Sequence, residues 1–259
     1  MRPRCDGNHA PDLLGSTMNA KQTVLDAVAA VFGDRDLTAV DRYFGPVYKQ
    51  HSALGADGTE GLKTLIKGLP ADFAFRALRV IVDGDLVVTH GLYEGFGPAP
   101  IAGFDVWRVV DGRIVEHWDA LAPVGGQTPE DTAPVEGQTE PGDVDQTSNN
   151  RVLVTDWVRR VLIDGEEKVD DFVSIGSVDR SRAGASISIP ASAAGEPIPY
   201  TTLHQVIAEG DLVFTRVEGA GEPSLILNDL WRVSAGRIVE RWSVVAAVPA
   251  QLPHTNGSF

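Results

Sequence analysis

Acidic and imidazole side chains recur at short spacing near residue 110. Asp105 and Trp107 are two residues apart, and so are His117 and Asp119. Successive side chains of a β-strand point to opposite faces, so each pair shares a face if this stretch is stranded. Histidine exchanges protons near neutral pH without any pKa shift, and a carboxyl group does so when buried. Residues of these types on one face are suited to moving protons in acid–base catalysis.

The stretch that holds these residues occurs twice in the 259-residue chain. Residues 82–90 match residues 208–216, and residues 105–118 match residues 229–242. Agreement over this length predicts two homologous domains in tandem. The second copy keeps one acid and loses the other candidates: Asp229 replaces Asp105, Arg216 replaces His90, Arg241 replaces His117 and Ser243 replaces Asp119. We therefore expect an active site in the first copy.

Helical periodicity precedes strand-like sequence in each copy. In the first copy, apolar spacing predicts three helices, within residues 19–32, 40–47 and 62–69. Strands are expected at residues 73–82, 86–92, 104–110 and 113–121, with Asp-Gly hairpin turns at 83–84 and 111–112. In the second copy a helix is expected at 151–163, whereas 186–194 lacks helical spacing. This order predicts an α+β fold, with helices packed on a curved antiparallel sheet.

Composition divides the chain into five segments. Residues 1–17 are expected to be a disordered N-terminal extension, and residues 18–126 the first domain with its active site. Residues 127–148 are rich in Pro, Gly and acids and contain no Lys or Arg. Such a stretch buries too little apolar surface to offset its ordering entropy, which predicts a mobile acidic linker. Residues 149–250 form the expected second domain, and residues 251–259 a C-terminal tail.

Charge and composition narrow the classes of partner. The formal net charge is −14, so the surface is expected to repel phosphate backbones, and nucleic-acid binding is not expected. No apolar run is long enough for a membrane span, and the N-terminus lacks the apolar region of a secretory signal. Cys5 is the only cysteine, which excludes an intrachain disulfide and favours a cytoplasmic protein.

Several segments of the first copy carry a resemblance to a known family. They are Tyr48–His51, Asp57–Leu62, Gly84–His90 and the hairpin Phe104–Asp119. The chain resembles the SnoaL-like polyketide cyclase group of the nuclear-transport-factor-2-like superfamily, over the first copy and the C-terminal half of the second. The resemblance implies two tandem cone-shaped α+β barrels, the second degenerate. It is specific for fold rather than reaction, because this superfamily hosts cyclases, isomerases, epoxide hydrolases and binding modules.

The resemblance also implies a pocket on the concave face of the first sheet. Its expected members are His51, His90, Asp105, Trp107, His117 and Asp119. Ketosteroid isomerases are similar in this hairpin, with an enolate-binding acid that matches Asp105 and a general base that matches His51. We expect Asp105 as the catalytic acid/base, with His51 and His117 as its catalytic partners. The other three residues are expected to bind substrate.

These expectations define a function and its alternatives. The main hypothesis is an enzyme of the polyketide cyclase or isomerase type, which performs aldol cyclisation or isomerisation on a small hydrophobic carbonyl compound. It would need no cofactor and no metal. The alternative is a non-catalytic ligand-binding or scaffold protein of the same fold. An epoxide-hydrolase-like site would need an Asp–Arg–Asp arrangement. Three histidines with Asp119 could ligate iron or zinc, but their dispersed spacing argues against it.

The second domain has two interpretations. Members of the family commonly dimerise through the convex face of the sheet, so the two domains are expected to pack as an intramolecular pseudo-dimer, with further homodimerisation left open. The competing interpretation is that Arg216 and Arg241 bind an anionic ligand.

Overall fold

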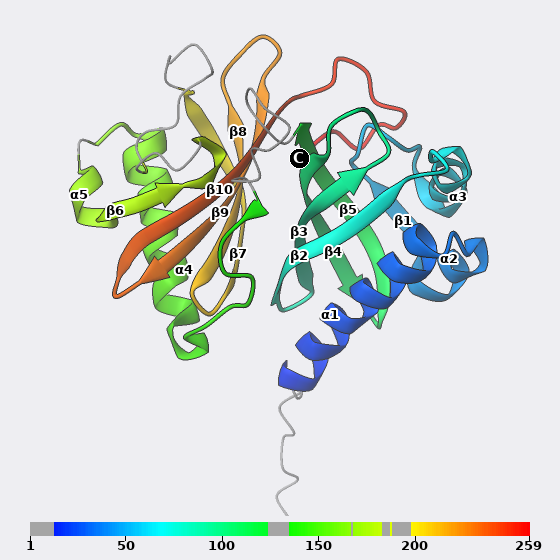
Figure 1. Cartoon of the computed structure of the whole chain (residues 1–259), viewed down its shortest axis with the longest axis horizontal. Coiled ribbons are helices and arrows are strands. Elements are labelled where there is room, and N and C mark those ends of the chain that lie inside the picture. The colour runs from blue at the N-terminus through cyan, green and yellow to red at the C-terminus, as the bar shows by residue number, and fades with distance from the viewer. Residues whose placement is uncertain (1–12, 124–134, 167, 183–186, 188–197) are drawn as a thin grey trace, which may run out of the picture.

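Two five-stranded sheets form the framework of the computed structural model, which describes residues 13–123, 135–166, 168–182, 187 and 198–259 (Figure 1). The first sheet has the order β1-β5-β4-β3-β2 and contains β1 (Phe44–Gln50), β2 (Ala74–Asp83), β3 (Leu86–Glu94), β4 (Ile101–Val110) and β5 (Arg113–Pro123). The second has the order β6-β10-β9-β8-β7 and contains β6 (Val173–Asp179), β7 (Tyr200–Glu209), β8 (Leu212–Gly219), β9 (Leu225–Ser234) and β10 (Arg237–Ala247). The matching orders confirm two tandem α+β domains.

Helices cover the outer side of each sheet (Figure 1). The first domain has α1 (Leu13–Val28), the π-helical turn η1 (Ala29–Gly33), α2 (Leu37–Tyr43) and α3 (Gly58–Gly68). The second has η3 (Val144–Gln146), α4 (Thr147–Asp156), η4 (Trp157–Ile163), α5 (Val169–Phe172) and η5 (Arg180–Arg182). Val24, Leu62 and Ile66 of the predicted apolar stripes are buried in one cluster with Trp107. Within the described ranges, no helix is both long and apolar enough to cross a bilayer.

Strand β1 brings a loop of the first domain to the candidate site. Strands β2 to β5 form antiparallel hairpins, and positive φ angles at Gly84, Asp111 and Gly112 agree with the predicted turns. Strand β1 instead pairs in parallel with β5, and such a pairing requires a long crossover connection. Its register places Gln50 beside His117.

Two parts of the first domain differ from the sequence-based prediction. Helix α1 begins at Leu13, before the boundary expected at residue 18. Residues 44–47, predicted as helix, belong to β1, where Pro46 is tolerated because an edge strand does not need its missing amide hydrogen. Val47 is 78% exposed and never joins an apolar helical face. Residues 1–12, and all of 186–194 except Ile187, lie outside the described residues.

A hydrophobic cluster joins the two sheets. Its buried members come from β2 to β5 and from β7 to β10, and they include Phe104, Trp118, Phe214 and Trp242. The ring centroids of Phe104 and Phe214 are 5.4 Å apart. Along each strand these side chains alternate with those that face the helices. Each sheet therefore uses one face for its own core and the other for this shared cluster, and the sheets lie side by side between the helices (Figure 1).

The described part of the expected linker, residues 135–148, contacts both domains. The buried Arg79 guanidinium donates to the carbonyl oxygens of Val135, Glu136 and Gln138. The oxygen of Gln138 also accepts from Arg232 of the second domain. This part therefore makes backbone contacts with arginines of both domains. Its acidic composition gave no sign that arginines of both domains would bind its backbone.

Candidate active site

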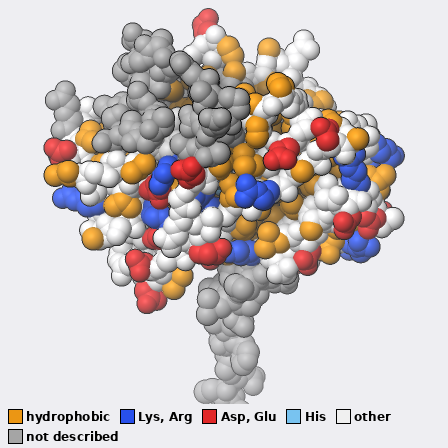
Figure 2. Space-filling view, in the orientation of Figure 1, with side chains coloured by type: hydrophobic (Ala, Val, Ile, Leu, Met, Phe, Trp, Pro, Cys, Tyr) orange, Lys and Arg blue, Asp and Glu red, His pale blue; other side chains and the backbone are white. Residues whose placement is uncertain are grey.

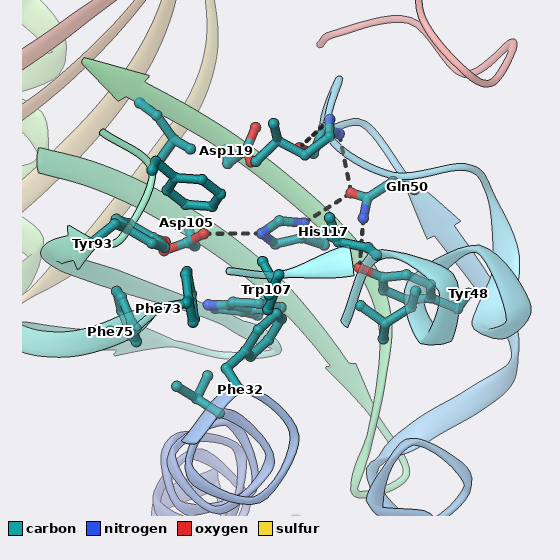
Figure 3. A pocket seen from close by; sticks show the side chains of 18 residues that line it. Phe32, Tyr48, Gln50, Phe73, Phe75, Tyr93, Asp105, Trp107, His117 and Asp119 are labelled. Atoms are coloured by element: carbon teal, nitrogen blue, oxygen red, sulfur yellow. Dashed lines mark hydrogen bonds and ion pairs between the residues drawn. The ribbon is translucent and has the colours of Figure 1, made fainter. Parts of the chain in front are cut away.

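A cavity in the first domain lies between the helix-covered face of the sheet and helices α1 and α3 (Figure 3). It contains about 550 Å³ of space that protein atoms do not fill, including its open mouth. Most of its lining is apolar: Val28, Phe32, Leu54, Leu62, Leu65, Leu69, Phe73, Phe75, Phe96, Trp107 and Leu121. Such a lining favours a hydrophobic ligand, because burying apolar surface is favourable by roughly 25 cal/mol per Å².

Three ionisable side chains meet at the polar end of this cavity. Asp105 on β4 pairs across the strands with Asp119 on β5, and His117 lies two residues before Asp119. One carboxylate oxygen or ring nitrogen from each lies within 4.8 Å of the others. Asp105 and His117 are buried, and Asp119 is partly exposed. The shared face expected from strand alternation is therefore present.

Both carboxylate oxygens of Asp105 have partners. Tyr93 Oη and Thr89 Oγ1 each contact Oδ2, the latter at 3.1 Å. Thr89 Oγ1 accepts from Trp107 Nε1 at 3.2 Å, which leaves its own hydrogen to donate to Asp105. Two hydroxyl donors on one oxygen suit a carboxylate, which only accepts hydrogen bonds. The other oxygen, Oδ1, lies 3.2 Å from His117 Nε2.

Gln50 fixes the orientation of His117. Its Oε1 accepts from the backbone N–H groups of His51 and Ser52 at 3.1 and 3.0 Å, which identifies this atom as the amide oxygen. His117 Nδ1 lies 2.9 Å from the same oxygen and must therefore carry a proton. The Nε2 atom is left to face Asp105, as the dashed contacts in Figure 3 show.

One proton would complete the contact between His117 Nε2 and Asp105 Oδ1 as a hydrogen bond. With Nδ1 protonated, Nε2 either holds the shared proton, which gives an imidazolium–carboxylate pair, or accepts it from a protonated Asp105. Both forms use the same contact between Nε2 and Oδ1. The pair can therefore give or take a proton without moving a side chain, as acid–base catalysis requires.

The environment of Asp119 raises the pKa of this third group. Burial favours its neutral form, and the nearby Asp105 adds to the rise, whereas His117, a hydrogen bond with Ser52 and the charge of Arg216 act in the opposite direction. The net shift is toward the range in which a carboxyl group exchanges protons near neutral pH. Because its side chain is only partly covered, Asp119 can reach a ligand in the cavity.

Two tyrosines and a tryptophan complete the polar end. Burial raises the pKa of Tyr48 and Tyr93 well above the ordinary value, so both keep their hydroxyl protons. Tyr93 donates to Asp105, and Tyr48 Oη accepts from Gln50 Nε2 at 3.1 Å. The Trp107 ring stacks on the imidazole of His117 with centroids 4.1 Å apart. Trp107 thus lines the cavity beside His117.

His51 points away from the cavity. Its Nδ1 lies 2.9 Å from the carbonyl oxygen of Gly257, its Nε2 lies 3.0 Å from Glu116 Oε1, and its ring stacks on Trp118. It is not among the residues that line the cavity, and the expected partnership with Asp105 is not formed. The reason is strand alternation, which gives the inward position to Gln50.

His90 lies on the other face of the sheet, within the contact between the domains. Its ring stacks on Phe104 with centroids 4.2 Å apart, and its Nδ1 accepts from Arg79 Nη1 at 3.2 Å. Burial, together with the charge of Arg79, lowers the pKa of His90 well below its ordinary value, so the ring stays neutral. The expected contact between His90 and a substrate in the cavity is not formed.

Two alternatives from the sequence are also not assembled. The three-histidine metal site fails because two of the rings face away from the cavity. Within the described residues, the group that could offer metal ligands is Asp105, His117 and Asp119, one imidazole and two carboxylates. The Asp–Arg–Asp arrangement of an epoxide-hydrolase-like site is absent from the cavity, whose described lining holds no arginine.

The second domain replaces the proton-sharing pair with a fixed ion pair. Arg241, at the position of His117, donates to Asp229 Oδ1 at 2.7 Å and to Asp179 Oδ2 at 3.0 Å. These side chains are at most 2% exposed. Burial alone would lower the pKa of Arg241, but Asp229 and the other groups around it raise it above the ordinary value. Arg241 therefore exchanges no proton, and the contacts it makes argue against its binding an anionic ligand.

The sequence analysis did not predict Gln50, Tyr48, Thr89 or Tyr93 as residues of the site. A signal was available for the first two, because assignment of residues 44–50 as a strand would have put Tyr48 and Gln50 on one face and His51 on the other. Thr89 and Tyr93 lie on β3, opposite Asp105 or near it. They could have been found from the pairing of β3 with β4, which requires a register that the sequence alone does not give.

Comparisons with solved structures find several similar proteins. TsrD from Streptomyces laurentii is similar in structure, with 19% identity over 39% of this chain and 87% of its own, and a TM-score of 0.34. An epoxide hydrolase of the LEH-like type from M. tuberculosis shows 24% identity over 41% of this chain and 84% of its own, with a TM-score of 0.34. Wild-type IdmH from Streptomyces antibioticus, provisionally a polyketide cyclase, shows 21% identity over 39% and 91%, with a TM-score of 0.35.

A search of curated proteins finds no match. The model of the SnoaL-like domain matches residues 25–117, which run from α1 to the middle of β5 and include Asp105 and His117. This match covers most of the first domain, which is therefore similar to the SnoaL-like domain family.

Proposed function

We propose that the first domain is an enzyme that moves protons within a small hydrophobic carbonyl compound, without a cofactor, in an aldol cyclisation or an isomerisation. The observation that supports this most is the group of Asp105, His117 and Asp119 at the polar end of an otherwise apolar cavity. An apolar site of this kind excludes water from the enolate that would form there.

In this proposal Asp119 is the base. Its carboxylate takes a proton from the carbon α to the carbonyl, and the electron pair of that C–H bond forms the enolate. The proton shared by Asp105 and His117 is offered to the enolate oxygen, so negative charge develops opposite a donor already in place. In an isomerisation, Asp119 returns its proton to another carbon. In an aldol reaction, the enolate carbon attacks a second carbonyl, whose oxygen takes the proton held by Asp119. The enolate oxygen returns its proton to the Asp105–His117 pair as the first carbonyl re-forms.

These roles revise the sequence-based assignment. Asp105 and His117 keep their places in proton transfer as a pair. Asp119 changes from a substrate-binding residue to the base, because the pKa of its carboxyl group is raised and its side chain is partly exposed to the cavity. His51 and His90 have no direct role in the proposal.

We also propose that the two domains form an intramolecular pseudo-dimer. The hydrophobic cluster shared by β2 to β5 and β7 to β10 supports it. A hydrophobic small molecule remains the proposed ligand, and nucleic acid is not proposed. On the face in Figure 2, Lys and Arg side chains lie among acidic ones rather than in one basic patch.

Hydrogen–deuterium exchange tests the proton transfer without knowledge of the natural substrate. The protein would be incubated in D₂O with α-tetralone, a bicyclic aryl ketone, and deuterium at the α-carbon would be followed by NMR. We expect exchange faster than in buffer, and faster for α-tetralone than for the smaller cyclohexanone, because more apolar surface is buried.

Binding of 2-naphthol, a fluorescent mimic of an enol, separates the proposal from its alternative. Binding of 2-naphthol without exchange of either ketone would favour a ligand-binding module. If the protein neither binds 2-naphthol nor exchanges a ketone, both hypotheses are contradicted.

A further inference from the structure

The last residues of the chain cross from the second domain to the first. After β10 ends at Ala247, the C-terminal segment, residues 251–259, runs toward the first domain (Figure 1, red). There it contacts three successive residues that follow or end β1: Asn256 Nδ2 donates to Gln50 O at 2.8 Å, Gly257 O accepts from His51 Nδ1 at 2.9 Å, and His254 Nε2 donates to Ser52 O at 2.9 Å.

Asn256 binds the backbone of Gln50 from the open side of β1. Strand β1 is at the edge of its sheet and pairs only with β5, so groups on its other side need partners elsewhere. Gln50 N–H donates to Asp57 Oδ1 at 2.8 Å, and Asn256 Nδ2 donates both to that oxygen and to Gln50 O, each at 2.8 Å. Both backbone polar groups of Gln50 are therefore held.

The second domain fixes the place of this segment. Arg216 Nη2 on β8 donates to the carbonyl oxygen of Ser258 at 2.5 Å, and Ser258 is buried. The ring of Phe259 stacks on His204 of β7 with centroids 4.2 Å apart. The segment thus follows β10 at one end, is held on the second sheet by Ser258 and Phe259 at the other, and touches the first domain between them.

From these contacts we propose that Asn256 is a positioning residue for the proton-sharing pair. It holds the backbone of Gln50, whose side-chain oxygen keeps the proton of His117 on Nδ1 and turns Nε2 toward Asp105. The second domain, which has no proton-sharing pair of its own, in this way orders the pair of the first. The expected effect on catalysis rests on the proposed function, whereas the expected effect on the tautomer of His117 does not.

The test is the tautomer of His117, read from the ¹⁵N shifts of its ring in the full-length protein at a pH where the ring is neutral. We expect the Nδ1–H tautomer in the unaltered protein and a shift toward the Nε2–H tautomer in Asn256→Ala. Asn256→Asp, which has the same shape but no donor, should behave like Asn256→Ala. Thr255→Ala, at the exposed neighbouring residue, is the matched control and should change nothing.

Exchange kinetics give the catalytic readout. We expect Asn256→Ala to slow α-tetralone exchange about tenfold at saturation, since small displacements of a positioned group have effects of that size. Its KM should stay near that of the unaltered protein, because Asn256 does not line the cavity. Gln50→Ala should shift the tautomer in the same direction, and the double variant should add little to either change.

The outcomes separate the two proposals. An unaltered tautomer in Asn256→Ala, with the melting temperature retained, would overturn the positioning role. If the unaltered protein exchanges no ketone while Asn256→Ala still changes the tautomer, the proposed function fails and the positioning role stands.

Discussion

Replacement of Asp119 by Asn tests the base of the proposed reaction. Asn has nearly the same shape and can still accept from Ser52, but it cannot take a proton. General acid–base catalysis contributes about 10²- to 10⁴-fold to rate, which corresponds to about 3–5 kcal/mol of activation free energy. We expect α-tetralone exchange to fall by that factor, while 2-naphthol binding persists because the apolar lining is intact.

The same substitution should stabilise the fold at neutral pH. Below about pH 3.9, the pKa of an unperturbed Asp, the carboxyl group is protonated in both the folded and the unfolded chain. As pH rises from there through the raised pKa of folded Asp119, the unfolded chain releases its proton first, so the unaltered protein loses stability. The loss is about 1.4 kcal/mol for every tenfold difference in proton affinity. Asn does not titrate and avoids it.

Denaturant unfolding at several pH values would measure this difference, with exchange assayed on the same samples. Asp111→Asn, at an exposed acid in the β4–β5 turn, is the control and should change neither quantity. The reasoning would be refuted if Asp119→Asn kept its exchange rate within about threefold, well under the contribution of a general base. It would also be refuted if the gain in stability did not grow as pH rises above that of an unperturbed Asp.

Two further substitutions test the second domain. Asp229→Asn leaves Arg241 without one of its two buried carboxylates. We therefore expect a loss of about 3–5 kcal/mol in the free energy of unfolding and an unchanged His117 tautomer. A loss below about 1 kcal/mol would argue that the pair is not buried as described. Phe214→Ala removes a ring from the cluster between the sheets and should cost about 3–5 kcal/mol by denaturant unfolding, whereas a cost near zero would argue that the sheets do not pack there.

The fold followed from local signals in the sequence. The hairpins over residues 83–84 and 111–112 depend on residues that tolerate positive φ, and those residues are visible in the chain. Strand β1 was missed because its partner β5 lies more than sixty residues away and pairs with it in parallel. Apolar spacing in residues 40–47 imitates a helix, and tertiary pairing decides the conformation there.

The site was predictable in part. Alternation within the β4–β5 hairpin put Asp105 on one face with Trp107 and His117 on one face with Asp119, and the resemblance put both pairs in one pocket. Whether His51 and His90 point toward the cavity or away from it depends on which face of the strand each residue occupies. The sequence does not fix this, because it does not fix where the strands begin and end. A shift of one residue moves a side chain to the opposite face. The contribution of Asn256 could not be predicted, because it depends on how the two domains pack.

The burial of apolar surface between the domains explains why the second domain would be retained although it lacks an Asp–His pair. Without the second domain, the first would expose the buried residues that it contributes to the shared cluster: Ala102, Ala120 and five larger side chains, Ile81, Val88, Phe104, Val106 and Trp118. At about 1.5–3 kcal/mol each, burial of the five larger side chains alone contributes roughly 8–15 kcal/mol, comparable to the whole stability of a typical domain. Selection on that surface leaves the opposite face of the second sheet free to change. There Arg241 forms a buried ion pair with two carboxylates, whereas the matching His117 of the first sheet contacts Asp105 through a ring nitrogen.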